Sequence, residues 1–308
     1  GVGMIITGGI SPNEEGGVGS KLATAEEAAQ HKIITDAVHA ADSDVKICMQ
    51  ILHAGPLAHA ANVVAPSAIK SRISPITPQA LDEAGIEKQI ADFANCASRA
   101  QEAGYDGVEI IGSAGYLLST FLVEKTNQRT DQWGGSYENR MRFPVEVVRR
   151  VREAVGEKFI VIFRIAAMDM LEGGMSWDEV VQLGKKVEEV GATIISTHFT
   201  WHESAVPTIS TRVPRAAFAS VTGRLRKELT IPTITSNRIN MPDVAEKVLT
   251  DGDADIVSMA RPMLADANLV VKALEGREDE INTCIACNQA CLDHTFTGQE
   301  VSCLVHPR

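Results

Sequence analysis

Four of the six cysteines in the sequence lie in one short stretch near its end. They are Cys284, Cys287, Cys291 and Cys303, separated by two, three and eleven residues. A loop with cysteines two and three residues apart can turn three thiolates toward one point, and the downstream cysteine completes the set. Four thiolates can bind a zinc ion or an iron–sulfur cluster. Structural zinc sites more often pair two Cys-x2-Cys segments, so the spacing favours a 4Fe–4S cluster, with zinc and disulfides or free thiols as alternatives.

Composition narrows the class of protein that could surround such a group. The chain has 308 residues, of which 44% are hydrophobic and 22% charged, so it can bury a large core. Its net charge of −11 argues against a nucleic-acid partner. No apolar run approaches the roughly 18 residues of a membrane span. Cys48 and Cys96 stand alone in the sequence, which fits a reducing cytoplasm better than a secreted disulfide framework.

Strands and helices are expected to alternate along most of the chain. Apolar, β-rich runs predict seven strands, at residues 4–9, 45–52, 107–112, 159–165, 192–198, 231–236 and 254–260. Helical patterns fall at residues 25–41, 83–103, 138–155, 177–190, 214–229 and 241–250, with a last helix ending near residue 275. Continuous apolar strands indicate a parallel sheet that is buried on both faces.

A parallel sheet of this kind is either doubly wound or closed into a barrel. No Gly-x-Gly-x-x-Gly sequence follows a strand and opens a helix, which lowers the case for a dinucleotide-binding fold. We therefore expect an α/β fold of the (β/α)8 TIM-barrel type over residues 1–276, with the first strand missing from this chain. Residues 277–308 are expected to form a short iron–sulfur-binding segment.

In a TIM barrel the functional side chains lie at the carboxyl ends of the strands. Polar residues at these positions are Gln50, His53, Tyr116, Arg164, His198, His202, Asn237, Arg238 and Arg261. An ion pair at a strand end would explain any one of the arginines, but three on one face favour a bound anion. A cation within an apolar strand, as at Arg164, is costly without an anionic or electron-rich partner.

Several longer motifs resemble the old yellow enzyme family of FMN-binding barrels. They are GYLLSTFL at residues 115–122 and TNQRTDQWGGSYENR at residues 126–140. The motifs WHE at 201–203, SMARP at 258–262 and INTCIACNQAC at 281–291 resemble the iron–sulfur branch of that family, and most of all the NADPH-dependent 2,4-dienoyl-CoA reductases of bacteria.

The resemblance implies cofactors and a role for each site residue. It implies FMN bound by strand-end residues, namely Gly9, Gln50, Arg164, Arg238, Ala260 and Arg261. Tyr116 would donate a proton to the substrate, with His202 assisting it. The substrate would be bordered by Asn127, Gln128, His202 and Glu203. The four clustered cysteines would ligate a 4Fe–4S cluster that passes electrons to FMN.

The implied activity is reduction of a conjugated C=C bond in 2,4-dienoyl-CoA, a step of unsaturated fatty acid β-oxidation. Reduced FMN would supply a hydride from N5, and Tyr116 with His202 the proton. NADPH would reduce FAD, bound by domains of the same protein that would follow this chain. An acyl-CoA and these domains are thus the expected partners, with no nucleic acid and no membrane.

One departure from the family pattern bears on the substrate. Ile111 and Ala114 stand where typical members have a His-x-x-Asn or His-x-x-His pair that binds the substrate carbonyl. This favours a thioester held in another way. A 2-enoate reductase or other NAD(P)H-dependent ene-reductase remains an alternative, as does a non-catalytic electron-transfer barrel. An amine dehydrogenase needs an aromatic cage, which three tryptophans and three tyrosines make hard to assemble.

Overall fold

The structure is a computed structural model, and it describes residues 1–17 and 19–306. The chain divides into two compact units. One, the N-terminal unit, is Gly3–Ser204; the other, the C-terminal unit, consists of Gly1–Val2 and the chain from Ala205 onward. Among the described helices, none is both long and apolar enough to cross a membrane.

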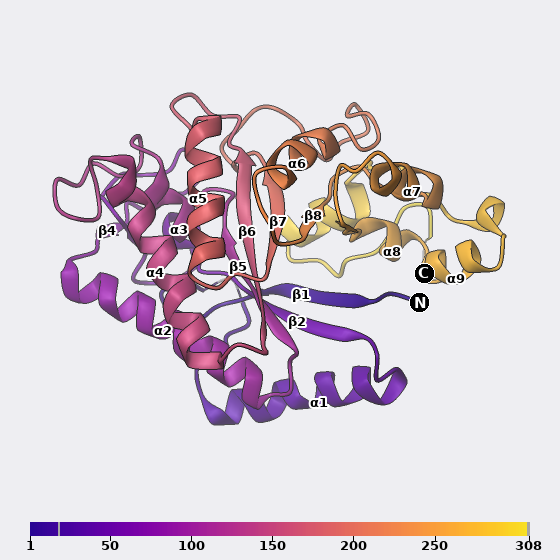
Figure 1. Cartoon of the computed structure of the whole chain (residues 1–308), viewed down its shortest axis with the longest axis horizontal. Coiled ribbons are helices and arrows are strands. Elements are labelled where there is room, and N and C mark those ends of the chain that lie inside the picture. Colours follow the sequence, from indigo (N-terminus) through magenta and orange to yellow (C-terminus); the bar gives the residue numbers. More distant parts are fainter. Residues whose placement is uncertain (18, 307–308) are drawn as a thin grey trace. The chain divides into compact units, whose positions relative to one another are not determined.

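The N-terminal unit is built on five parallel strands that pair in the order of the chain (Figure 1). They are β1 (Met4–Ile10), β2 (Lys46–Ile51), β5 (Gly107–Gly112), β6 (Ile160–Met168) and β7 (Ile194–Phe199). The central strand β5 is buried along its whole length. This is the burial that an apolar strand in the middle of a covered parallel sheet should have.

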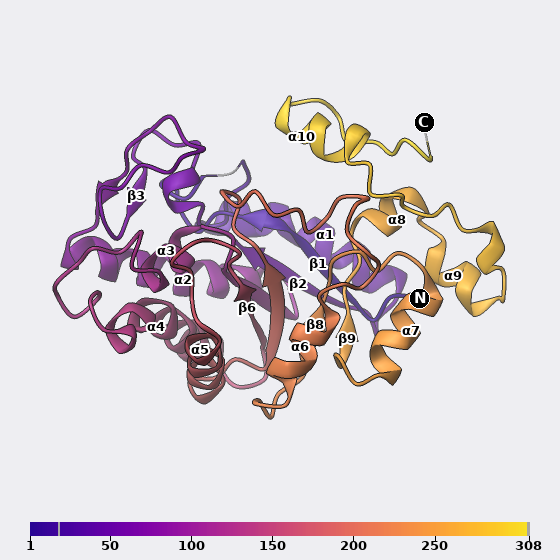
Figure 2. The same cartoon turned by 90° about the horizontal axis from the view of Figure 1, so that it is seen from above.

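A helix connects each strand of this sheet to the next. The four are α1 (Ala25–Ala41), α2 (Glu83–Glu102), α4 (Tyr137–Val155) and α5 (Trp177–Glu189). Each packs beside the helix before it, so they form a layer along the sheet (Figures 1 and 2). Repeated strand–helix–strand units of this kind place the carboxyl ends of all the strands at one edge of the sheet.

Side-chain caps fix where the helices begin. The Thr24 hydroxyl accepts the backbone N–H of Glu27, whose carboxylate accepts the backbone N–H of Thr24 in return, before α1. Ser176 and Glu179 form the same reciprocal pair before α5. A capping side chain stabilises a helix by about 1 kcal/mol, so these starts are encoded locally.

Short elements lie between the regular units. Residues 53–80 contain a 3-10 turn, η1 (Gly55–Leu57), and the short parallel pair β3 (Val64–Ala65) and β4 (Gln79–Ala80). After β5 comes the short helix α3 (Leu117–Leu122), every residue of which is buried. The sequence patterns did not predict α3, because six apolar or small residues in a loop motif show no helical periodicity.

The C-terminal unit holds the parallel pair β8 (Thr233–Thr235) and β9 (Ile256–Val257). Its helices are α6 (Ala219–Arg226), α7 (Pro242–Thr250), α8 (Arg261–Ala265) and α9 (Leu269–Leu274). A 3-10 turn η2 (Glu278–Glu280), a π-helical turn η3 (Gln289–Asp293) and a single turn α10 (His294–Phe296) follow. A small core packs Ile239 and Val248 against Ala219 and Ala254.

The described residues thus show an α/β fold with the seven predicted parallel strands and the additional short pair β3 and β4, and this is consistent with a TIM-barrel type of fold. The last two strands are shorter than their apolar runs suggested. The compact units divide between Ser204 and Ala205. The expected boundary at residue 276 and the missing first strand stay predictions.

Candidate active site and cysteine pocket

Tyr116 and His202 lie together at the carboxyl ends of two strands. Tyr116 precedes α3 just beyond β5, and His202 follows β7. The Tyr116 Oη and His202 Nε2 atoms are 2.8 Å apart, with the ring centroids 5.1 Å apart and the rings at 61°. The backbone N–H of His202 donates to the Ala114 carbonyl at 3.2 Å, which ties the two loops together. The predicted catalytic pair is therefore within hydrogen-bonding distance.

Burial sets the protonation of this pair. It raises the pKa of the Tyr116 phenol, an effect that the nearby Arg164 charge opposes. It lowers the pKa of the His202 imidazole. At neutral pH the phenol is therefore protonated and the imidazole neutral, so one of the two atoms donates to the other. A protonated phenol that is hydrogen-bonded to a neutral imidazole can act as a general acid and be reprotonated through it.

A buried carboxylate, Asp169, holds the loop that carries His202. Its Oδ1 accepts the indole N–H of Trp201 at 2.6 Å, and its Oδ2 accepts the backbone N–H of Met175 at 2.7 Å. Trp201 in turn packs against Gly115, where an added Cβ would lie 2.9 Å from the indole. Sequence reasoning missed Asp169, although an acidic residue directly after an apolar strand was a usable signal.

A second buried carboxylate, Glu109 in β5, brings together two residues that were predicted to bind FMN. Gln50 Nε2 donates to Glu109 Oε1 at 2.6 Å, and Arg164 Nη1 lies 3.7 Å from the same oxygen. Arg164 Nη1 also donates to Ser196 Oγ at 3.4 Å. The Glu109 side chain is 0% exposed. The sequence analysis did not single out Glu109, although it is a charged residue inside an apolar run.

Gly9 pairs with Gln50 across β1 and β2. A Cβ added at Gly9 would lie 2.7 Å from the Leu52 side chain. A side chain at this position would therefore have to displace Leu52, and a close approach of FMN to Gly9 stays a prediction.

The residues expected to border a substrate differ in their exposure and in the hydrogen bonds that they form with other residues of the chain. Asn127 is 3% exposed, and its Nδ2 donates to the carbonyls of Phe121 and Trp133, both at 2.8 Å. Gln128 is exposed. The Glu203 carboxylate accepts the hydroxyl of Ser71, so the loop after β7 is joined to the segment before β4. Asn127 thus holds its own loop in shape, and substrate contacts for all three stay predictions.

Two arginines that were expected to bind phosphate lie in the C-terminal unit. Arg238 Nε donates to the Val213 carbonyl at 2.9 Å, and Arg261 Nη1 donates to the Ile209 carbonyl at 2.9 Å. Burial and then the charge of Arg261 lower the pKa of Arg238, while Cys284 opposes this. Guanidinium groups that repel each other in this way suit an anion such as a phosphate. The third expected residue, Ala260, directly precedes α8.

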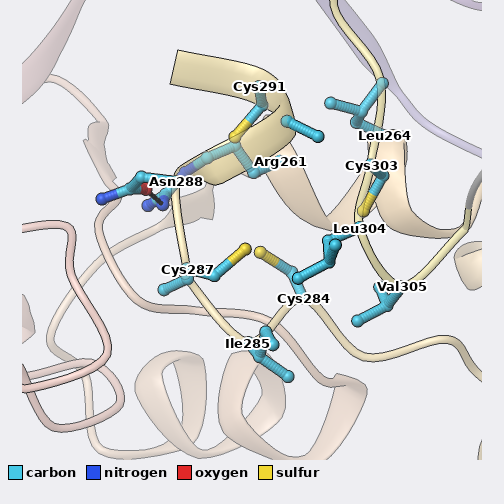
Figure 3. A pocket seen from close by; sticks show the side chains of 12 residues that line it. Arg261, Leu264, Cys284, Ile285, Cys287, Asn288, Cys291, Cys303, Leu304 and Val305 are labelled. Atoms are coloured by element: carbon cyan, nitrogen blue, oxygen red, sulfur yellow. Dashed lines mark hydrogen bonds between the residues drawn. The ribbon is translucent and has the colours of Figure 1, made fainter. Parts of the chain in front are cut away.

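The four clustered cysteines line a single pocket in the C-terminal unit (Figure 3). Their side chains come from the loop before η3, from η3 itself and from the strand-like segment at Cys303, and the sulfur atoms turn toward the same space. None of the described cysteines forms a disulfide. About 310 Å³ of space free of protein atoms lies in and around the pocket mouth, and part of it is open solvent.

Hydrogen bonds and backbone geometry fix the shape of the cysteine loop. Ala286 and Asn288, on either side of Cys287, have φ angles of 56° and 65°. Thr211 Oγ1 donates to the Ile285 carbonyl at 2.6 Å, and Asn240 Nδ2 donates to the Cys284 carbonyl at 2.7 Å. Arg261 Nη1 also reaches Asn288 Oδ1. The loop is thus held by residues from three other segments of the unit.

The spacing of the thiols bears on what the pocket could hold. Within the described part of the chain, no three His, Cys, Asp or Glu side chains stand close enough to bind one metal ion. Four sulfurs at 2.3 Å from a zinc ion would lie only about 3.8 Å apart. An iron–sulfur cubane carries its four cysteines on separate iron atoms, which sets them farther apart. The 4Fe–4S cluster and the zinc alternative therefore both stay predictions.

Comparison with known proteins identifies the family of the chain. The sequence profile of the NADH:flavin oxidoreductase / NADH oxidase family matches residues 1–280. A metal reductase of Desulforamulus reducens is 44% identical over 277 residues, which is 89% of this chain and 41% of that protein. An NADH oxidase of Thermoanaerobacter brockii is 37% identical over 89% of this chain and 43% of its own length. The chain thus spans less than half the length of these relatives.

Solved structures show the same fold. The structure of a 2-naphthoyl-CoA reductase with 2-naphthoyl-CoA superposes with a TM-score of 0.94 at 31% identity, covering 99% of this chain and 49% of that one. Morphinone reductase superposes with a TM-score of 0.74 at 27% identity, covering 89% of this chain and 78% of its own. The matched profile spans most of the chain, and the chain therefore belongs to the NADH:flavin oxidoreductase / NADH oxidase family, the FMN-dependent oxidoreductases of the old yellow enzyme type.

Proposed function

We propose that the chain is the FMN-binding part of an ene-reductase, an enzyme that reduces a C=C bond conjugated to a carbonyl group. The observation that carries this proposal is the contact between Tyr116 and His202, with Oη and Nε2 2.8 Å apart. A phenol and an imidazole at the carboxyl ends of β5 and β7 stand where this kind of fold places its chemistry. Membership in the flavin oxidoreductase family supports FMN as the hydride donor.

The proposed roles follow from the contacts of each side chain. When bound, FMN supplies the hydride. Gln50 and Arg164, joined through Glu109, offer an amide and a cation to the polar edge of its ring. Arg238 and Arg261 offer positive charge to its phosphate. Tyr116 then gives a proton to the carbon next to the substrate carbonyl, and His202 keeps the phenol oriented and relays a proton from solvent to restore it.

We further propose that the cysteine pocket holds a 4Fe–4S cluster that feeds electrons to the flavin. Four thiols around one pocket, with none of them in a disulfide, support this. NADPH and FAD, bound elsewhere in the complete protein, are the proposed source of those electrons. A cluster is suited to this place in the sequence of transfers because it passes electrons one at a time.

The proposed substrate is an α,β-unsaturated carbonyl compound, either a CoA thioester or a free acid. The likeness to a 2-naphthoyl-CoA reductase supports a thioester. A cinnamate reductase of Clostridium sporogenes, 30% identical over 79% of this chain and 39% of that protein, supports a free acid. Ile111 and Ala114 at the usual carbonyl-binding positions favour the thioester. A 2,4-dienoyl-CoA is one member of the proposed class.

The aromatic residues give little support to an amine substrate, despite a likeness to histamine dehydrogenase of Rhizobium (TM-score 0.89, 27% identity, covering 100% of this chain and 46% of that one). Trp133 and Trp201 are 6% and 2% exposed, and their indole N–H groups donate to Glu83 and Asp169. Side chains buried in this way cannot form a cage around an alkylammonium ion.

Stopped-flow measurement of flavin reoxidation tests the proposal. Reduced protein is mixed without oxygen with a 2,4-dienoyl-CoA, cinnamoyl-CoA or free cinnamate. Histamine, an electron donor that cannot reoxidise the flavin, is the negative control. Tyr116→Phe is expected to slow reoxidation by the unsaturated compounds about 10²–10⁴-fold, because it removes the general acid. Tyr105→Phe is the matched control, since its hydroxyl contacts His31 Nδ1 at 3.0 Å in another part of the unit. Full reoxidation speed in Tyr116→Phe, or no reoxidation by any unsaturated compound in the wild type, would contradict the proposal.

A further inference from the structure

Glu109 lies at the centre of a group of polar side chains on one face of the N-terminal sheet. It pairs directly with Gln50 of β2, while two residues farther along β5 Ile111 pairs with Arg164, which in turn pairs with Ser196. Directly paired residues of neighbouring strands, and residues two apart on one strand, share a face. Gln50, Glu109, Arg164 and Ser196 therefore all project to the same side, and the contacts among them follow from register.

The contact with Glu109 determines which way the Gln50 amide points. An ionised carboxylate only accepts hydrogen bonds, so it takes the amide nitrogen of Gln50, at 2.6 Å, and not the carbonyl oxygen. The amide oxygen and the second N–H are then directed away from β5. The pyrimidine edge of a flavin offers one N–H donor beside carbonyl acceptors. An amide that presents a free oxygen and a free N–H, as Gln50 does, is complementary to this edge.

The same carboxylate oxygen is the counter-charge of Arg164. The Arg164 side chain is 19% exposed and Glu109 is 0% exposed, so both charges are largely removed from water. A buried cation needs a partner to hold it in one place. Glu109 Oε2 has no hydrogen-bond partner among the described residues, so the carboxylate still has capacity to accept from a guanidinium that moves closer.

We propose that Glu109 is a positioning residue for the flavin site: it fixes the polarity of the Gln50 amide and balances the charge of Arg164. This rests on the proposed binding of FMN at these two residues. Glu109 does not touch the reacting atoms and acts only through Gln50 and Arg164. Its negative charge offsets part of the positive charge that Arg164 presents to the ring, so it also moderates how strongly the site favours the reduced, anionic flavin.

Two substitutions separate geometry from charge. Glu109→Gln keeps an oxygen that can accept from Gln50 but removes the negative charge, whereas Glu109→Leu removes both. Glu109→Gln is therefore expected to raise the midpoint potential of the bound flavin and to weaken FMN binding less than tenfold. Glu109→Leu is expected to weaken FMN binding about 10–100-fold, the effect that losing a residue that orients a metal ligand has on metal binding.

The test is titration of FMN-free protein with FMN, followed by flavin fluorescence, together with a redox titration of the loaded protein. Glu179→Gln is the control, because it breaks a similar ion pair in which Arg140 Nη2 lies 2.9 Å from Glu179 Oε1. An unchanged potential in Glu109→Gln together with unchanged affinity in Glu109→Leu overturns the inference and leaves the proposed function standing. Failure of the wild type to bind FMN overturns both.

A double substitution shows whether Glu109 acts through Gln50. Gln50→Leu alone is expected to weaken FMN binding, and Gln50→Leu with Glu109→Gln should weaken it by less than the product of the two separate effects. Independent effects that multiply would show that Glu109 only stabilises the fold. Glu109→Gln preserves the shape of the side chain, so this measurement remains possible if Glu109→Leu does not fold.

Discussion

At the scale of single residues, the protonation of Tyr116 and His202 limits when a proton can be delivered. Burial lowers the pKa of His202 below its ordinary value of about 6.5, and burial raises the pKa of Tyr116 above its ordinary value of about 10. Neither group should change its charge between these two values. The two shifts therefore widen the pH range in which a protonated phenol faces a neutral imidazole.

We accordingly predict that the rate of reoxidation by an unsaturated substrate is nearly independent of pH from about 6.5 to about 9.5. His202→Asn should lower the rate because the phenol loses the imidazole that orients it, while the rate still shows no step in that range. Stopped-flow traces across the range provide the measurement. A step near pH 8 in the wild type that disappears in His202→Asn would show that the imidazole titrates there.

Asp169 acts one contact farther from the chemistry. Its carboxylate accepts from both Trp201 Nε1 and the Met175 backbone N–H. Asp169→Asn puts an NH2 group against one of those donors, so it should reduce the free energy of unfolding by about 1–3 kcal/mol. It should also slow reoxidation, since the loop with His202 loses its anchor. Urea unfolding measures the stability and stopped-flow measures the rate. A loss of stability with no change in the reoxidation rate would show that Asp169 stabilises the fold without positioning His202.

The site residues that could be predicted from sequence are those in recognisable motifs. Tyr116 and His202 were predicted and lie in contact, and Gln50 and Arg164 share one carboxylate. Glu109 and Asp169 were missed because their importance comes from what they touch across strands and loops. Those contacts join residues 59 and 32 positions apart, and a pattern within one segment does not carry them.

At the scale of elements, the cysteine loop is shaped by two residues with positive φ. A residue with a Cβ costs about 1–2 kcal/mol in this left-handed conformation, and Asn or Gly costs less. Asn288 also bonds to Arg261 through its side chain. Ala286, at φ 56°, has no such compensation from its methyl group.

We predict that Ala286→Gly is neutral or stabilising, that Asn288→Gly is mildly destabilising, and that Asn288→Ala reduces the free energy of unfolding by about 1–2 kcal/mol more. Glycine adopts the left-handed conformation without cost and loses only the hydrogen bond to Arg261. Alanine loses this hydrogen bond and is also strained in the left-handed conformation. Thermal unfolding of the three variants gives the order. Equal stability of Asn288→Gly and Asn288→Ala would mean that backbone conformation contributes nothing here.

The contents of the cysteine pocket provide a separate prediction. Purified protein should contain about four iron atoms and four acid-labile sulfides per chain, and Cys287→Ser should lose most of them. Cys48 provides the control, because burial raises the pKa of its thiol to about 12 and keeps it protonated. Cys48→Ala should therefore retain the iron. Finding one zinc ion per chain and no sulfide would contradict the cluster assignment and show that the pocket is a zinc site.

Periodicity predicted the long elements well and the short ones poorly. The helix expected at residues 83–103 is Glu83–Glu102, and that expected at residues 177–190 is Trp177–Glu189. The strand expected at residues 254–260 shrinks to Ile256–Val257, and the helix Leu117–Leu122 was not expected. Short elements are decided by tertiary packing, since few residues cannot establish a period.

At the scale of the whole molecule, three histidines that are partly or fully removed from water connect folding to pH, and His53 is the buried one. Burial lowers the pKa of His53 to about 3, and it also lowers the pKa values of His198 and His202. In the unfolded chain each would titrate near 6.5. The unfolded state therefore binds more protons below pH 6.5, so stability is fully present above that pH and is lost as the pH falls toward the lowered values.

The net negative charge of the chain has the opposite effect on stability when the pH falls. The formal charge is −11 at pH 7, and taking up protons reduces the repulsion among the carboxylates. Most carboxylates take up protons only below about pH 5, where their ordinary pKa values lie. Between pH 6.5 and pH 5, the histidines with lowered pKa values, above all the buried His53, should therefore dominate the change in stability.

We predict that the free energy of unfolding decreases between pH 6.5 and pH 5, with His53 alone contributing up to about 1.4 kcal/mol per pH unit. The His53 ring stacks on Phe93, and its Nδ1 accepts the backbone N–H of Gly55 at 3.1 Å, so a proton there would break a bond inside the core. His53→Asn keeps an acceptor but cannot be protonated, and it should flatten the slope, whereas the same change at the exposed His59 should not. Urea unfolding at several pH values measures the slopes. If His53→Asn retains the wild-type slope, the acid sensitivity arises from other groups, such as His198 and His202.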